Sequence, residues 1–113
     1  MTKVYVDGSP KEVCCVSNGK VSRAPIDGEN TNNVVEYRAI LFGLYKHPEA
    51  TEVVSDSQLI IKQLSGEYTI RQEHLKVLVN KVRTRVEKLK HEVKFTWVPR
   101  GENKAGRILK WLQ

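Results

Sequence analysis

The chain has 113 residues, 40% of them hydrophobic and 28% charged, and its 19 Lys and Arg against 13 Asp and Glu give a net charge of +6. This length fits one domain, and the composition excludes a wholly disordered or collagen-like chain. No apolar run approaches the roughly 18 residues of a membrane-spanning helix, and the N-terminus lacks the apolar core of a signal peptide, so we expect a cytoplasmic protein. The positive charge indicates a polyanionic partner, nucleic acid before an acidic membrane surface.

Three short β-favouring runs open the chain and predict an antiparallel meander. They cover residues 3–6, 12–16 and 21–24. The dipeptide Asn18-Gly19 between the second and third runs is a strong signal for a tight hairpin. Cys14 and Cys15 are neighbours in the second run, so they should point to opposite faces of the sheet. A disulfide between them would be strained, and we expect two free, buried thiols.

The rest of the chain alternates helical and extended patterns. It predicts helices over residues 34–45, 56–64 and 74–90 and from residue 103 onward, the last carrying Ile108, Leu109, Trp111 and Leu112, and strands over residues 51–55 and 93–98. The outer face of the 74–90 helix carries six Lys and Arg and one acid, Glu87. Such a face is either a solvated surface or a track for phosphates. The element order β-β-β-α-β-α-α-β-α predicts one mixed α/β domain.

Three carboxylates occupy positions where this topology could form a site. Asp7 ends the first strand, Asp56 ends the fourth, and Glu36 lies one turn inside the first helix. Carboxylates at adjoining strand ends repel one another unless they share a cation, and oxygen ligands are preferred by Mg²⁺ and Mn²⁺. Such a cluster in a basic protein indicates two-metal phosphodiester chemistry. Each acid alone also fits an ordinary role as turn former, surface residue or N-cap, and spacing by itself leaves both interpretations open.

Four segments carry a resemblance to a known family. They are residues 4–9, 31–40, 54–60 and 97–103, and the second contains the most specific pattern, Thr-Asn-Asn-x-x-Glu-Tyr. In these segments, which follow the family's order, the chain resembles ribonuclease H of type 1, most of all its compact archaeal and reverse-transcriptase-like members. The resemblance implies that residues 1–113 form a single ribonuclease H-like domain, with a five-stranded mixed sheet flanked by helices.

The resemblance also implies an activity and a site. The activity is cleavage of the RNA strand of an RNA/DNA hybrid by a metal-activated water, leaving a 3′-hydroxyl and a 5′-phosphate. Asp7 would bridge two Mg²⁺ or Mn²⁺ ions, while Glu36 and Asp56 would hold the second. The implied substrate contacts are Asn32 and Asn33 in the minor groove, with helix capping as their alternative role, and Gln58. No membrane or protein partner is implied, and we expect a monomer.

The chain departs from the family in three respects. Residues 8–11 form a shorter loop than the family's glycine-rich one, and the basic protrusion of larger bacterial members is absent. The family's fourth carboxylate, expected after Asn103, is also missing. An ungapped count puts Arg107 at its position, whereas a one-residue deletion puts Gly106 there. We prefer the ungapped count, because a deletion rotates the following helix face by about 100°.

The missing acid leaves more than one function open. Arg107 cannot ligate a cation but could contact phosphate, and Glu102 is the one nearby acid that could replace the ligand. The first hypothesis is an active, metal-dependent hybrid nuclease. The alternative is a catalytically weak or inactive ribonuclease H-fold module that binds hybrid or double-stranded nucleic acid. Retention of three acids favours the first, since binding a polyanion would be better served by neutral residues. A basic domain that binds protein or membrane is a third, less favoured interpretation.

Overall fold

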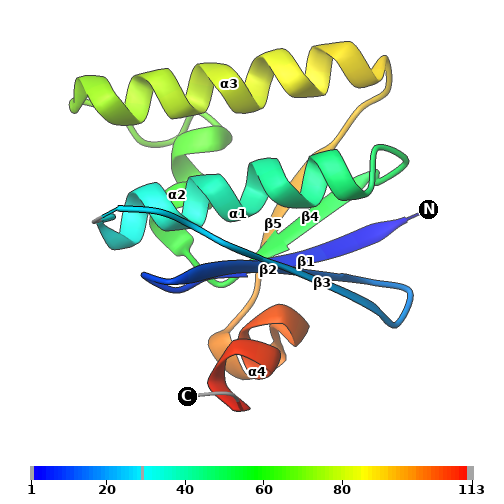
Figure 1. The fold of residues 1–113 in the computed structure, drawn as a ribbon. Coiled ribbons are helices and arrows are strands. Elements are labelled where there is room, and N and C mark those ends of the chain that lie inside the picture. The colour runs from blue at the N-terminus through cyan, green and yellow to red at the C-terminus, as the bar shows by residue number, and fades with distance from the viewer. Residues whose placement is uncertain (1, 29, 112–113) are drawn as a thin grey trace.

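A computed structural model gives the structure of the protein and describes residues 2–28 and 30–111, apart from the side chains of Lys110 and Trp111. Five strands form one mixed sheet in the order β3-β2-β1-β4-β5, as Figure 1 shows. The strands are β1 (Lys3–Gly8), β2 (Glu12–Ser17), β3 (Lys20–Pro25), β4 (Glu52–Ser55) and β5 (Lys94–Trp97). β1, β2 and β3 pair antiparallel, and β4 and β5 continue the sheet in parallel from β1. The expected five-stranded mixed sheet is confirmed.

The helices cover both faces of this sheet. They are α1 (Asn32–Lys46), α2 (Gln58–Leu64), α3 (Glu73–Leu89) and α4 (Lys104–Trp111), with a short 3₁₀ turn, η1 (Arg100–Glu102), before α4. α1, α2 and α3 lie on one face, and α4 lies on the other (Figure 1). No described helix is both long enough and apolar enough to cross a membrane. Of the residues predicted on the last helix, Leu112 and the side chain of Trp111 lie outside the described part of the chain.

Local chemistry explains the element boundaries. Asn18 and Gly19 have φ angles of 51° and 77°, the left-handed pair that a two-residue hairpin needs. α1 begins two residues earlier than predicted, at Asn32, because the Thr31 side chain accepts a hydrogen bond from the amide of Val34 at 3.4 Å. The hairpin and the capped helix thus follow from short sequence signals.

The strand alternation divides the core into two layers. Val4, Val6 and Cys15 pack toward α1 and α3 in the larger cluster, whereas Cys14 joins Leu109 of α4 in the smaller one. Both cysteines are free and buried, as expected. The opposite orientations of Cys14 and Cys15 follow from the two-residue period of the strand.

Close backbone packing places α1 against the end of β1. A Cβ added at Gly8 would lie 2.2 Å from Cγ1 of Val35, and one at Gly43 would lie 2.6 Å from Cγ1 of Val6. Only glycine permits such an approach without rearrangement. β1 and β4 are parallel neighbours, with Tyr5 opposite Val54, so their carboxyl ends meet at one edge of the sheet beside the first turn of α1.

Candidate active site

Three carboxylates converge at this edge of the sheet. Asp7 comes from β1, Asp56 directly follows β4, and Glu36 lies in the second turn of α1. Each offers an oxygen, and these three oxygens lie within 4.8 Å of one another. Asp7 is buried, with 5% of its surface exposed, and the other two are half-buried. The structure therefore brings together the three acids that the sequence predicted as a site.

The proximity of these acids changes their proton affinity. Burial, and next the charge of Asp7, raises the pKa of Glu36 to about 9. Burial and the charge of Asp56 also raise the pKa of Asp7. In addition, Oε2 of Glu36 is buried without a hydrogen-bond partner. A carboxylate oxygen in this position needs either a proton or a cation beside it, because an unpaired buried charge is strongly unfavourable.

Asn103 fastens the start of α4 to the acid cluster. It is fully buried, and its Nδ2 donates to the carbonyl of Val6 at 2.9 Å and to Oδ2 of Asp56 at 3.0 Å. Its Oδ1 accepts a hydrogen bond from the amide of Ala105 at 3.1 Å and so satisfies the first turn of α4. Asn103 was not among the residues predicted for the site. Its place in a matching segment was the available signal.

The structure overturns the ungapped count for the missing acid. Gly106, not Arg107, faces the cluster: a Cβ at Gly106 would lie 3.3 Å from Oδ2 of Asp7 and 3.3 Å from Oδ2 of Asp56. Arg107 is exposed, and its Nε donates to the carbonyl of Gly101 at 2.8 Å. Because α4 begins immediately after Asn103, its third residue, Gly106, faces the acids, and its fourth, Arg107, is turned from it by about 100°. A one-residue deletion after Asn103 was disfavoured because it would rotate the following helix face by about 100°. The position at which α4 starts sets this rotation, so the objection does not apply.

The remaining candidates lie around the cluster without joining it. Glu102 is exposed in η1 and is not one of the acids that converge in the described part of the chain. Asn32 is exposed and Asn33 is half-buried in the first turn of α1, and Gln58 is exposed at the start of α2. Because Thr31 already caps α1, Asn32 and Asn33 are not needed as caps. Their role as substrate contacts stays a prediction.

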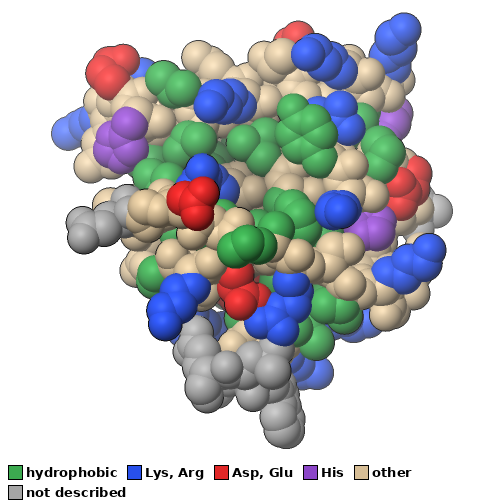
Figure 2. Space-filling model, in the orientation of Figure 1, with side chains coloured by type: hydrophobic (Ala, Val, Ile, Leu, Met, Phe, Trp, Pro, Cys, Tyr) green, Lys and Arg blue, Asp and Glu red, His purple; other side chains and the backbone are tan. Residues whose placement is uncertain are grey.

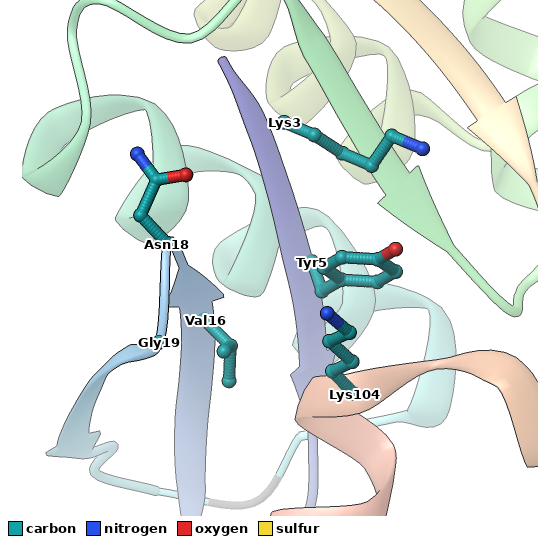
Figure 3. Close-up of a pocket in the computed structure, with 6 residues that line it drawn as sticks. All are labelled: Lys3, Tyr5, Val16, Asn18, Gly19 and Lys104. Atoms are coloured by element: carbon teal, nitrogen blue, oxygen red, sulfur yellow. The ribbon is translucent and has the colours of Figure 1, made fainter.

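A separate hollow of about 200 Å³ lies on the α4 side of the sheet, and Figure 3 shows the side chains that line it. Nζ of Lys104 lies 5.3 Å from the centre of the Tyr5 ring, and Nζ of Lys3 lies 6.0 Å from it. Lys3 also approaches Glu52 at 3.9 Å. Both cations are thus already engaged with the aromatic ring, and none of the three acids lines the hollow.

Comparison with known proteins gives consistent relatives. The family model described as reverse transcriptase-like matches residues 7–109. The bifunctional protein Rv2228c of Mycobacterium tuberculosis is 34% identical in an alignment over 80 residues that covers 67% of this chain, and the chain spans only 22% of its length. The solved N-terminal RNase H domain of Rv2228c has a TM-score of 0.77 at 26% identity, with 96% of this chain and 94% of that chain covered. LC11-RNase H1, isolated from compost and solved with an RNA/DNA hybrid, has a TM-score of 0.86 at 26% identity, with both chains fully covered.

Proposed function

The chain belongs to the reverse transcriptase-like ribonuclease H family, and we propose that it is a metal-dependent endonuclease that hydrolyses the RNA strand of RNA/DNA hybrids. The observation that carries this proposal is the convergence of Asp7, Glu36 and Asp56 within 4.8 Å. The hybrid bound to LC11-RNase H1, a relative with the same fold, supports the choice of substrate. Residues 1–113 would act as one domain and as a monomer.

The acid cluster fits a divalent cation. Its donors are carboxylate oxygens only, which suits Mg²⁺ or Mn²⁺, and Oε2 of Glu36 is buried without a partner. Burial, followed by repulsion from Asp7, raises the pKa of Glu36 to about 9, and a cation held by Asp7, Glu36 and Asp56 would offset both effects. When bound, such an ion polarises phosphoryl oxygens and makes water a stronger nucleophile at neutral pH.

The surrounding residues orient this cluster and the substrate. Asn103 restrains the Asp56 carboxylate through its hydrogen bond to Oδ2, so that the two strand-end acids keep a fixed spacing. Asn32, Asn33 and Gln58 lie at the starts of α1 and α2, next to the elements that carry the acids, and we assign them to contacts with the hybrid. Arg107 is exposed beside η1 with its Nε bonded to the Gly101 carbonyl, and we assign its guanidinium to contact with a phosphate.

A nuclease assay tests the proposal. Labelled RNA/DNA hybrid, duplex DNA and duplex RNA are each incubated with the protein and Mg²⁺ or Mn²⁺. We expect cleavage of the RNA strand of the hybrid alone, with 5′-phosphate products, and loss of cleavage in Asp7→Asn. A pure preparation that binds hybrid but cuts it with neither metal would refute the catalytic part of the proposal.

One observation favours the alternative of a catalytically weak or inactive module that binds hybrid or double-stranded nucleic acid. Gly106 faces Asp7 and Asp56 at the point where a side chain would complete the cluster, and glycine offers no ligand. Calorimetric titration separates the alternatives. Binding of Mg²⁺ or Mn²⁺ that disappears in Asp7→Asn supports the nuclease, whereas hybrid binding without detectable binding of either ion supports the module.

A further inference from the structure

A groove runs between α1 and α3, on the helical side of the sheet. It has a volume of about 660 Å³ and is lined by Leu41, Tyr45, Val77, Asn80, Lys81, Thr84, Arg85 and Lys88. Figure 2 shows hydrophobic side chains gathered in a band along this helical layer, with Lys and Arg around the band. The groove shares no residue with the acid cluster.

The groove includes large apolar side chains that are exposed and do not fill the hydrophobic core. The inward face of α3 is formed by Leu75, Val79 and Val82, which are buried against α1. Val77 lies off this face and is 54% exposed, and Tyr45 of α1 is 63% exposed. Two large hydrophobic side chains lining one groove mark a contact surface better than the same residues scattered singly.

The polar part of the groove is cationic. Lys81, Arg85 and Lys88 line it, and no lining residue is acidic. The Arg85 guanidinium lies 4.3 Å from the centre of the Tyr45 ring and donates to the carbonyl of Leu44 at 3.4 Å, which holds it in the groove. Its Nε is buried and has no hydrogen-bond partner. That atom is closed to an incoming ligand, but a guanidinium fixed at the groove in this way is well suited to a carboxylate.

We propose that this groove binds a peptide segment of a partner protein that carries both carboxylates and apolar side chains. The cations complement its acids, and Leu41, Tyr45 and Val77 complement its apolar groups. Nucleic acid would use the cations but not the exposed aliphatic side chains. From Val77 to Lys88 the groove follows α3 for about 16 Å, the length of a three-turn helix or of about five extended residues.

Charge reversal and apolar truncation test the proposal on the intact protein. The probe is a fluorescent peptide of Glu, Leu and Ser, about 12 residues long so that as a helix it spans the groove. Its affinity is measured by anisotropy for wild type, Lys81→Glu/Lys88→Glu and Val77→Ser, all substitutions of exposed side chains. The matched control is Arg71→Glu, an exposed cation outside the groove. Circular dichroism confirms that each variant is folded.

We expect the double variant to raise the Kd by about tenfold or more and Val77→Ser by a few-fold, with Arg71→Glu unchanged. Peptides with Gln in place of Glu, or Ser in place of Leu, should bind more weakly than the probe. No binding of the probe to the wild type, or equal binding to wild type and groove variants, overturns the proposal. The proposal is also overturned if the peptide with Ser in place of Leu binds as tightly as the probe and a short DNA duplex displaces the probe. The groove would then be a general site for polyanions.

Discussion

The two sides of the acid cluster differ in what they contribute. The sheet and α1 supply three carboxylates, Asp7, Asp56 and Glu36, whereas α4 and the residue before it supply a buried amide and a glycine. Asn103 still donates to Asp56, so α4 is docked against the site although Gly106 brings no charge. The docking of this helix and its supply of a ligand are therefore separable properties.

The largest effect is expected on the carboxylate side. Asp7→Asn should reduce hybrid cleavage by about a thousandfold, since removing a cation ligand forfeits several kcal/mol of transition-state stabilisation. Hybrid affinity should change little. The matched control is Asp27→Asn, an exposed acid in the loop before α1. Initial cleavage rates and filter binding measure both quantities, and equal losses in the two variants would contradict the special role of Asp7.

The next effect is expected at the amide on the α4 side. Asn103→Ala leaves the Val6 carbonyl without its donor and frees Asp56, so we expect a loss of about 1–3 kcal/mol in the free energy of unfolding. Metal affinity should fall by about 10- to 100-fold, as for other groups that orient ligands. Urea unfolding and metal titration provide the measurements, with exposed Asn80→Ala as the control. Loss of stability with unchanged metal affinity would make Asn103 purely structural.

A gain is expected where the α4 side is empty. Gly106→Asp places a carboxylate beside Oδ2 of Asp7 and Oδ2 of Asp56, and an acid is also favourable in the first turn of a helix. We expect metal affinity and cleavage to rise by about tenfold, equivalent to about 1.4 kcal/mol.

Gly106→Ala is the matched control for this gain. It adds a Cβ at 3.3 Å from both oxygens without adding a ligand, so it should lower activity slightly. The aspartate and alanine variants therefore differ in sign. Equal behaviour of the two in the same cleavage assay would show that position 106 has no access to the cation.

Short-range signals in the sequence predicted the strands and helices, and they placed Asp7 and Asp56 at strand ends. Asn18-Gly19 specifies its own turn, and the spacing of Leu75, Val79 and Val82 specifies a helix face. Convergence of the acids within 4.8 Å follows from the parallel pairing of β1 with β4, a detail beyond the mixed sheet that the family resemblance implied. Their catalytic role stays a prediction.

Two features were not predictable by counting along the chain. The residue at which α4 starts decides whether Gly106 or Arg107 faces the acids. The Asn103 side chain fixes this start, and it is itself held by a hydrogen bond to the carbonyl of Val6, 97 residues away. The groove beside Val77 depends on which helix packs next to α3. A basic helix face by itself was equally consistent with a solvated surface. Both features arise from tertiary contacts that no local pattern encodes.

A smaller effect is expected in the pH dependence of stability. The pKa of Glu36 is about 9 in the folded protein, against an ordinary value of 4.5. At pH values between 4.5 and about 9, Glu36 holds a proton in the folded protein but has lost it in the unfolded protein. The metal-free protein should therefore become less stable as the pH rises across this range. Glu36→Gln should flatten the dependence, whereas exposed Glu92→Gln should not. Thermal unfolding at several pH values measures the effect, and Mg²⁺ or Mn²⁺ should restore stability at the alkaline end only in proteins that retain Glu36.

The smallest effect is expected at Arg107, and it decides how the α4 side meets the substrate. Because Arg107 is exposed and its Nε is bonded to the Gly101 carbonyl, Arg107→Ala should raise the KM for hybrid a few-fold and leave kcat unchanged. The slope of log affinity against log salt should fall by about one, the signature of one lost phosphate contact. Lys20→Ala, at the opposite end of the sheet, is the control. A fall in kcat at constant KM would instead place Arg107 at the reacting phosphate, and the α4 side would then contribute a charged group to the reaction.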